Sequence, residues 1–358
     1  MEIYIIDNAT LDRLGTVDEY KSFIWTAPYN DIGTFELECR IDLFPLLQTE
    51  RFVQCTEDEK HIGIIEDVLK VTSEDGSESL KVKGRFAEVV LERRVAVGEY
   101  AYGSTPPSEI AADMITKNAI DNRPIENLEI GTLAEADAID YAGSNEQLLS
   151  EVQAICQASY IGFNVKADTD NKKLIFETYS GIDRTEDAPL VFSRDRDTLI
   201  SLEYEKNITN ECNYIFIKGD GDVTTHIIAG DEEKTGLALK ERFLDLSSIS
   251  RTVDDTEIEL ETYKAMLQTS AMATMRQLVV NEMIDGEMYK LSNKKFGTDF
   301  FLGDIAIFVD EKMGLSVPLR ISSVQQTWGA EGHTVVVSLG DDVPAIYETI
   351  KLVMKGAK

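Results

Sequence analysis

Short runs of apolar or alternating apolar and polar residues fill the first 97 residues, and they limit the possible folds more than any other feature. Turn signals such as Asp31-Ile32-Gly33 and Glu74-Asp75-Gly76 separate these runs, as is typical of β-strands joined by short loops. The six runs are EIYIID, SFIWTAPY, GTFELECRI, RFVQCTE, HIGIIEDVLKVT and ESLKVKGRF. Strands at this spacing predict a small closed or nearly closed β-barrel over residues 1–97.

The pattern changes at residues 98–107, GEYAYGSTPP, which are rich in glycine and proline. Ser108 is then a candidate N-cap for a helix through SEIAADMITKNAI. A second helix is expected through EQLLSEVQAICQAS, with Ser144 or Asn145 as its cap, because its apolar residues recur at helical spacing. The runs IGFNVKA and KKLIFETYS, separated by DTDN, predict a hairpin. Residues 98–200 are therefore predicted to form an α/β module inserted after the first barrel.

The β pattern returns at residue 201 and predicts a second barrel over residues 201–345. Its expected strands are LISLEYEKN, NYIFIKG, VTTHIIAG, EMYKLS, GDIAIFVD, VPLRISSVQQTW and HTVVVSLG. A helix at about 254–284, capped by Asp254 or Thr256, is expected within it. The run AIYETIKLVM predicts a C-terminal helix over 346–358. The predicted fold class is mainly β with inserted α/β parts (α+β).

The charge balance argues against several kinds of partner. The chain of 358 residues has 35 Lys and Arg against 65 Asp and Glu, a formal net charge of −30. Such a surface repels phosphate backbones and anionic lipid. The first residues form neither a basic start nor a long apolar run, so no signal peptide or membrane-spanning segment is expected. Four scattered cysteines, without a CxxC pair, predict buried thiols made in a reducing cytoplasm; they are Cys39, Cys55, Cys156 and Cys212.

The turn Gly181-Ile182-Asp183-Arg184-Thr185 is the best candidate for a catalytic site, and it has two interpretations. Asp183 could be a nucleophile or base tuned by Arg184. Asp side chains also accept backbone N–H bonds in turns, and Gly181 supplies backbone freedom. Because no histidine and no second motif converge on this turn, the sequence favours a structural role.

No other motif indicates catalysis, a cofactor or a metal. His61, His226 and His333 each stand alone, without the spacing of a zinc site. The oxygen-rich segments 168–171 and 218–222 lack the EF-hand spacing, so they are interpreted as hairpin turns. GxSxG, P-loop and GxGxxG patterns do not occur. We therefore predict no catalytic, cofactor-binding or metal-binding residues.

Several blocks of the sequence, in order, resemble the baseplate hub or tail-associated proteins of long-tailed phages and prophages. They are IYIIDNATLDRLGTVDEYKSFIWTAPYNDIGTFELE, HIGIIEDVLKV, VKGRFAEVVLERRVA, YSGIDRTEDAPLVFS, LISLEYEKN and FLGDIAIFVDEKMGLSVPLRISSVQQTW. The resemblance covers nearly the whole chain. It implies two barrels akin to tail-tube subunits, and a homotrimer whose six barrels form a pseudo-sixfold ring that docks on a hexameric tube.

The same resemblance implies that GIDRT is a strand-to-strand connector, in which Asp183 and Arg184 brace the turn or a neighbouring strand. It also gives a signature of structural turn residues: Gly33, Phe35, Gly63, Glu66, Gly84, Arg85, Arg93, Arg94, Gly181, Asp183, Arg184, Thr185, Phe192, Ser193, Gly303 and Asp304. Related proteins often continue into an enzymatic or receptor-binding domain, whereas this sequence stops at Lys358, so the hub core alone is expected.

The implied function is a structural hub at the tail tip of a virion, made in the bacterial host cytoplasm. Its expected partners are further copies of itself, the tail tube or distal tail protein, and tail-tip or fibre proteins. DNA would pass through without specific binding, and an acidic lining would prevent phosphate adhesion. Two alternatives remain open: a tail-associated peptidoglycan hydrolase, and a carbohydrate-binding baseplate component. The second requires an exposed aromatic platform, whereas Trp25 and Trp328 fall in strand-like runs that favour burial.

Overall fold

A computed structural model describes most of the chain. The described residues are 1–72, 76–186, 189–196, 198–230, 233–253, 255–278, 281–288, 294–330 and 332–340. The predicted C-terminal helix over 346–358 and the candidate cap Asp254 lie outside these residues.

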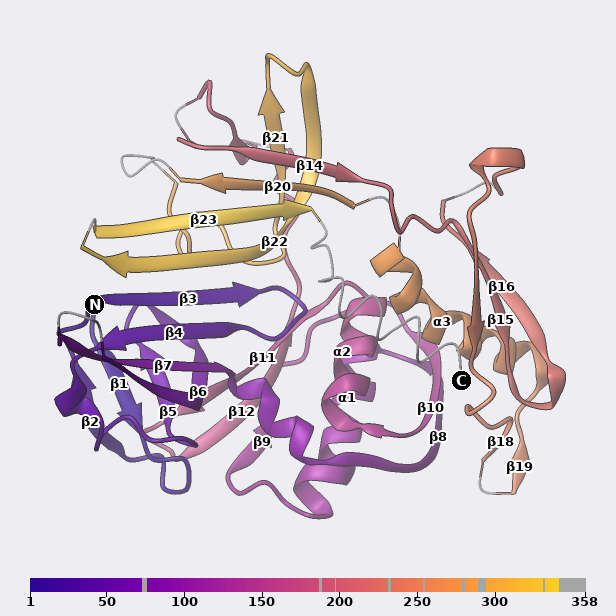
Figure 1. Cartoon of the computed structure of the whole chain (residues 1–358). Coiled ribbons are helices and arrows are strands. Elements are labelled where there is room, and N and C mark those ends of the chain that lie inside the picture. Colours follow the sequence, from indigo (N-terminus) through magenta and orange to yellow (C-terminus); the bar gives the residue numbers. More distant parts are fainter. Residues whose placement is uncertain are drawn as a thin grey trace.

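One large sheet joins the first β region of the chain to the last (Figure 1). Its strands follow the order β14-β20-β23-β22-β3-β4-β7-β6-β5-β1-β2, and β21 extends it by pairing with β22 and with β13. The bounds are β1 Ile3–Ile6, β2 Arg13–Val17, β3 Ser22–Pro28, β4 Thr34–Cys39, β5 Phe52–Cys55, β6 Asp58–Thr72, β7 Glu78–Phe86, β13 Val191–Phe192, β14 Glu203–Asn207, β20 Asn281–Glu287, β21 Ile305–Asp310, β22 Leu315–Gly329 and β23 Gly332–Gly340.

The expectation of two closed barrels is wrong for the described strands, because their pairing runs open from β14 to β2. Closing the first six runs into a barrel would require an N-terminal strand to occupy the free edge of β3. That edge instead pairs antiparallel with β22, with Phe23 opposite Trp328 and Trp25 opposite Gln326. The first β region and most strands of the last one therefore form one sheet, whereas the predicted runs NYIFIKG and VTTHIIAG form β15 Tyr214–Lys218 and β16 Thr224–Ile228 of a separate sheet.

Alternating burial explains why these runs form strands. In β3 every second side chain is buried, and Phe23 and Trp25 have no exposed surface. The Trp25 ring lies 4.4 Å from the Phe86 ring, and the Phe23 ring stacks on Trp328 at 5.6 Å, both measured between centroids. One hydrophobic cluster thus contains side chains from the first and the last β regions. Burying this apolar surface stabilises the pairing of β3 with β22.

The helices and strands of residues 95–179 pack beside the sheet around a second hydrophobic cluster. Their bounds are β8 Val95–Thr105, α1 Pro107–Ile115, a π-helical turn Thr116–Asp121, β9 Leu128–Ile130, β10 Ile139–Gln147, α2 Leu148–Ala158, β11 Gly162–Asp168 and β12 Lys173–Tyr179. The predicted hairpin is confirmed, since β11 pairs antiparallel with β12. GEYAYGST, for which no strand was predicted, is part of the long strand β8, which pairs with β10.

The predicted helix caps of this region are wrong. Pro106 precedes α1, and the buried Ser108 hydroxyl donates to the carbonyl oxygen of Ala134 at 2.7 Å. Ser144 and Asn145 belong to β10, and α2 begins at Leu148. Ser108 is buried in the interior, and β8 draws residues 144 and 145 into a strand, so these side chains are not available as caps.

A third cluster lies between α3, Leu260–Leu278, and a three-stranded sheet. That sheet contains β15 Tyr214–Lys218, β16 Thr224–Ile228 and β17 Glu241–Asp245. A small hairpin, β18 Thr252–Val253 and β19 Thr256–Glu257, precedes α3, and 3₁₀ helices span Ile41–Leu43, Ala87–Arg93, Asp220–Asp222 and Gly236–Ala238. In Figure 1 α3 lies on the opposite side of α1 and α2 from β1 and β2.

The helix predicted at about 254–284 is shorter at both ends. Thr256 lies in β19, and the Glu259 side chain instead accepts the backbone N–H groups of Glu261 and Thr262 at 2.9 and 3.0 Å. From Asn281 the chain forms β20, because Ile284 is buried in the core of the large sheet. No helix among the described residues is long and apolar enough to cross a membrane.

Candidate functional site

The GIDRT turn connects β12 to the strands of the last β region. The Asp183 carboxylate accepts the backbone N–H and the hydroxyl of Thr185 at 2.9 and 2.7 Å. These hydrogen bonds lower the pKa of Asp183, so it stays ionised. The side chain closes its own turn, as in the structural interpretation of the sequence.

Arg184 pairs with a buried carboxylate from a distant part of the chain. Asp304 is 1% exposed, and its Oδ2 accepts Arg184 Nε and the backbone N–H of Phe301, the latter at 3.0 Å. Its Oδ1 accepts the backbone N–H of Ile182 at 2.8 Å. A buried carboxylate with one cationic partner and two backbone donors is fully engaged. The sequence indicated both residues separately but gave no sign of their pairing.

Gly181 and Gly303 let this turn lie directly against the segment that carries Asp304. A Cβ on Gly181 would lie 1.9 Å from the carbonyl group of Gly303, which would force the two segments apart. Gly303 has φ +82, which favours glycine, and faces the ring of Tyr29. The Tyr29 hydroxyl donates to the carbonyl oxygen of Tyr160 at 2.9 Å, and Arg320 donates to that of Gly303 at 2.6 Å.

We call this cluster the junction; its residues are Tyr29, Tyr160, Gly181, Arg184, Gly303, Asp304 and Arg320. It connects segments that are far apart in the sequence. The guanidinium of Arg320 lies 5.4 Å from the centroid of the Tyr29 ring and 5.5 Å from that of Tyr160. Tyr29 follows β3, Tyr160 follows α2, and Arg320 lies in β22. The arrangement braces three segments, and none of these contacts pairs a nucleophile with a base.

The signature residues of the first β region gather at a second place, between β4, β6 and β7. A Cβ on Gly33 would lie 2.2 Å from the Phe86 ring, and one on Gly63 would lie 2.5 Å from the Phe35 ring. A Cβ on Gly84 would lie 1.8 Å from a backbone oxygen of β6. These glycines make room for buried aromatic rings.

The charged signature residues take part in ion pairs on the surface. Arg85 bonds to Glu66 and Glu92 at 2.7 and 2.9 Å, and these carboxylates raise the pKa of Arg85. Arg93 bonds to Glu50 at 2.6 Å. Exposed pairs of this kind contribute little stability individually.

Arg94, Phe192 and Ser193 lie apart from these pairs. Arg94 bonds to backbone carbonyl oxygens. The Phe192 ring packs edge-on against Phe300 with centroids 5.4 Å apart, and the backbone N–H of Ser193 donates to the Thr198 hydroxyl at 2.7 Å. The structure therefore distributes the signature over several places of the fold.

A buried ionisable cluster was missed by the sequence analysis. The carboxylate of Asp58 contacts Nδ1 of His61 at 2.8 Å and accepts the indole N–H of Trp25 at 2.9 Å. Glu88 accepts the backbone N–H of Val165 at 3.0 Å, and its Oε2 has no partner among the described residues. Acids are so abundant in this sequence that Asp58 three residues before His61 gave no usable signal.

Burial and mutual attraction shift the pKa values in this cluster. Burial raises the pKa of Glu88 to about 7. Burial opposes the charged form of His61, but the attraction and hydrogen bond of Asp58 raise the pKa of His61 above its usual value. His61 in turn holds the pKa of Asp58 below its usual value despite the opposing effect of burial. The cluster lies between the large sheet and β11, and the side chains of Asp58, His61 and Glu88 are all buried.

Other candidate ligands remain separate. His226 stacks on Tyr214, and His333 stacks on Trp328. The four cysteines are free thiols, and all are buried as predicted. Among the described residues, no group of three or more His, Cys, Asp or Glu side chains could hold a metal ion. Trp25 and Trp328 are 0% and 7% exposed, so the predicted burial of both rings is confirmed.

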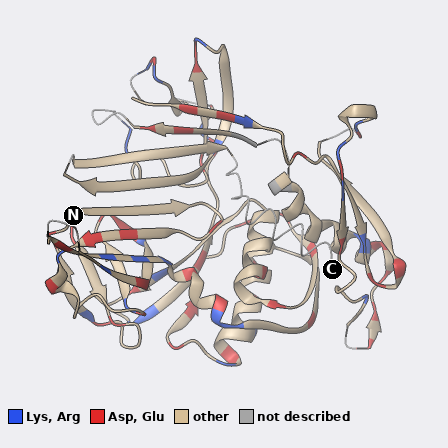
Figure 2. Ribbon diagram, viewed as in Figure 1, with Lys and Arg blue, Asp and Glu red and all other residues tan. Residues whose placement is uncertain are grey.

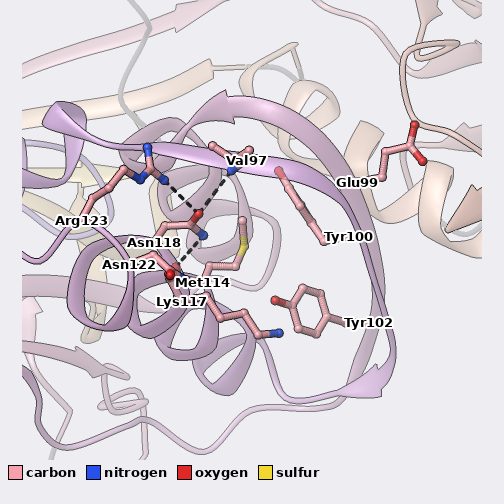
Figure 3. A pocket seen from close by; sticks show the side chains of 9 residues that line it. All are labelled: Val97, Glu99, Tyr100, Tyr102, Met114, Lys117, Asn118, Asn122 and Arg123. Atoms are coloured by element: carbon pink, nitrogen blue, oxygen red, sulfur yellow. Dashed lines mark hydrogen bonds between the residues drawn. The ribbon is translucent and has the colours of Figure 1, made fainter. Parts of the chain in front are cut away.

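A pocket of about 500 Å³ lies between β8 and the π-helical turn (Figure 3). Tyr100 and Tyr102 line one side, and Lys117, Asn118 and Arg123 line the other. Asn118 Oδ1 accepts the backbone N–H of Val97 and Nη2 of Arg123, both at 3.3 Å. Glu99, Val97 and Met114 also belong to the lining, which therefore mixes cationic, acidic and apolar side chains.

The fold of this chain is similar to that of solved tail proteins. One similar solved structure is the 43 kDa tail protein of prophage MuSo2 from Shewanella oneidensis, with a TM-score of 0.57 and 10% identity over 95% of this chain and 98% of that one. Another is the tail protein from Neisseria meningitidis MC58, with a TM-score of 0.60 and 14% identity over 95% of this chain and 96% of that one. The prophage tail protein gp18 from Listeria monocytogenes EGD-e is also similar, with a TM-score of 0.56 and 11% identity over 100% of this chain and 99% of that one. Residues 1–341 match the family described as Siphovirus ReqiPepy6 Gp37-like protein, and the chain belongs to that family. No curated protein matches the sequence.

Proposed function

We propose that this chain is the structural baseplate hub of a phage or prophage tail, a homotrimeric ring that joins the tail tube to tail-tip proteins. Its family and its fold, which is similar to that of three tail proteins over nearly their whole lengths, support this assignment. The observation that carries it is the continuous pairing of the first and last β regions through β3 and β22. In a trimer, these two halves would present six β units to a hexameric tube.

The junction supports a mechanical function. Arg184 and Asp304 bond to each other, and Asp304 and Tyr29 bond to backbone groups of neighbouring segments, so these segments resist relative movement. A ring that transmits force between tube and tip needs this kind of rigid connection. We assign no catalytic role to Asp183 or Arg184 in this proposal, and no cofactor.

The outward face of the large sheet is our candidate for the lining of the DNA channel. One cross-strand row on this face contains Thr334, Thr327, Ile24, Glu36 and Lys83 in successive strands. The cations Lys83, Lys21 and Arg85 on this face form ion pairs with carboxylates.

The ion pairs on this face are Lys83 with Glu36 at 2.7 Å, Lys21 with Glu38 at 2.7 Å, and Arg85 with Glu66 at 2.7 Å. A passing phosphate would therefore meet Lys83, Lys21 and Arg85 as cations that carboxylates already neutralise. This arrangement favours passage without adhesion.

The partners in this proposal are further copies of the chain, the tail tube or distal tail protein, and tail-tip or fibre proteins. The assembled protein would lie at the tip of the virion tail after synthesis in the cytoplasm of the bacterial host. DNA would pass through it without sequence-specific binding.

The native mass of the purified chain over a wide concentration range, with negative-stain images of the same fractions, tests the proposal. A trimer that forms an open ring is the expected result. A chain that stays monomeric at every concentration, even when mixed with the purified tail-tube protein, would contradict it.

A further inference from the structure

Arg94 is a cation that is held without a carboxylate. It donates to the carbonyl oxygens of Arg93, Arg123 and Pro124, the first and last at 2.9 Å. No Asp or Glu in the described part of the chain lies within 4.0 Å of its guanidinium. Arg51 and Arg320 are also held by carbonyl oxygens, but Arg94 differs from them because it bonds to the backbone of a second arginine, Arg123.

Arg123 lies next to it at the edge of the pocket in Figure 3 and has the same property. Its Nη2 donates to the carbonyl oxygen of Val95 at 2.8 Å and to Asn118 Oδ1 at 3.3 Å. The described residues place no carboxylate within salt-bridge distance of Arg123 either. We call Arg94 and Arg123 the arginine patch.

The arginine patch keeps donors for a ligand. An arginine side chain has five N–H groups in a planar fork. Arg94 commits three of them to carbonyl oxygens, and Arg123 commits the two on Nη2. The remaining donors, which these contacts leave unused, can each donate a single hydrogen bond to a carboxylate oxygen.

The complementary feature lies at the far edge of the large sheet, in β14 and β20. Glu203 is directly opposite Asp285 in the strand register, and Glu205 and Glu287 point to the same face. Acids paired in this way repel each other. Within the described ranges, no Lys or Arg lies within 4.0 Å of these four carboxylates. We call them the acidic edge, and Figure 2 shows red segments along both strands.

We propose that the acidic edge of one copy docks on the arginine patch of the next copy in the ring. The inference rests on the proposed function, because it names the contact that the homotrimer would use. β14 and β20 lie at the top of Figure 1, whereas β8 and β9 lie at the bottom, so the contact is between different surfaces of the two copies. Such head-to-tail contacts close into rings when their rotation allows it.

Charge explains why the contact would form at this place. Copies with a net charge of −30 repel each other at most orientations. The arginine patch is a local exception, and it would relieve the repulsion between Glu203 and Asp285. Complementary charges of this kind select orientation and register.

The test is a charge exchange in the full-length chain. The first variant carries R123E, the second carries E203K and E205K, and the third carries all three changes. Arg94 is kept because it braces the backbone. We expect each of the first two variants to raise the concentration at half-assembly by about tenfold, as measured by sedimentation velocity. The combined variant should return close to the wild-type value.

A second measurement that does not depend on assembly, and a matched control variant, accompany the exchange. The E203K/E205K monomer should unfold at a higher temperature than wild type, because the repulsion with Asp285 is removed, although it assembles less well. The variant R85Q, in which the lost cation is already held by Glu66 and Glu92, should assemble as wild type does.

The possible outcomes separate the two proposals. Two results would overturn this contact and leave the hub function in place. One is that R123E assembles at the same concentration as wild type, and the other is that the combined variant does not regain the wild-type concentration at half-assembly. Wild-type protein that never assembles, with or without the tail tube, would overturn both.

Discussion

Asp304 shows how single residues hold this molecule together. Its buried carboxylate receives Arg184 and two backbone N–H groups. Replacing it with alanine leaves these donors unsatisfied and Arg184 without its partner. We expect Asp304→Ala to lower the free energy of unfolding by about 3 kcal/mol.

Urea unfolding followed by the fluorescence of the buried Trp25 and Trp328 measures this loss. Asp183→Ala is the matched control, because Asp183 bonds within its own exposed turn. It should cost less than about 1 kcal/mol. Equal losses in the two variants would show that the Arg184–Asp304 pair does not brace the junction.

Glu88 predicts a pH dependence of stability. Its pKa is about 7 in the folded chain against an ordinary value of 4.5, so the folded state binds a proton more tightly than the unfolded state does. Stability contributed by this proton is present below pH 4.5 and is lost as the pH rises to about 7, by up to about 3 kcal/mol. His61, whose pKa is also raised, acts in the same direction.

The variant Glu88→Gln separates these contributions. Glutamine keeps an acceptor for the backbone N–H of Val165 and has no charge to desolvate. Chemical unfolding at a series of pH values should therefore show a smaller decline for the variant than for wild type, with the variant more stable at pH 8. Parallel pH profiles would mean that Glu88 is not protonated in the folded chain near neutral pH.

At the scale of elements, the pairing of β6 with β7 depends on Gly84. A Cβ at this position would lie 1.8 Å from the carbonyl oxygen of Ile64. Gly84→Ala should therefore push the two strands apart and cost about 2 kcal/mol. Hydrogen exchange of the β6 and β7 amides should increase. Gly103→Ala is the control, because the nearest atom to its added Cβ is 3.8 Å away. Unchanged exchange in Gly84→Ala would contradict the close approach.

Elements with strong alternation could be predicted from the sequence, whereas their partners could not. Runs such as SFIWTAPY became β3 because every second side chain is buried. β8 was missed because its tyrosines alternate with glycine and alanine, and it is only partly buried. The helix caps failed because burial of Ser108 and strand pairing of Ser144 override local preference.

Sequence distance explains the remaining failures. β3 pairs with β22 about 300 residues later, and no local pattern indicates which strand occupies the free edge of β3. For the candidate site, the GIDRT turn could be interpreted as structural from its own residues. Its partner Asp304 and the contact with Tyr29 arise from tertiary packing.

At the scale of the whole molecule, the proposed channel makes a prediction about DNA ejection. Glu36 and Glu66 neutralise Lys83 and Arg85 on the outward face of the large sheet. Replacing both acids with lysine would free Lys83, leave Arg85 with Glu92 as its remaining partner, and add two more cations. Because freed cations bind phosphates, phage particles that carry Glu36→Lys/Glu66→Lys should eject their DNA more slowly, most clearly at low salt.

A matched change of charge elsewhere separates the channel face from net charge. Glu129 and Glu177 pair with Lys173 and Lys166 on β9, β11 and β12, away from this face. Glu129→Lys/Glu177→Lys therefore changes the net charge by the same amount without adding cations to the proposed lining. Single-particle ejection with a fluorescent DNA dye should show slow ejection for the first pair and wild-type ejection for the second. Normal kinetics in both would place the channel on another surface, and slow kinetics in both would attribute the effect to net charge.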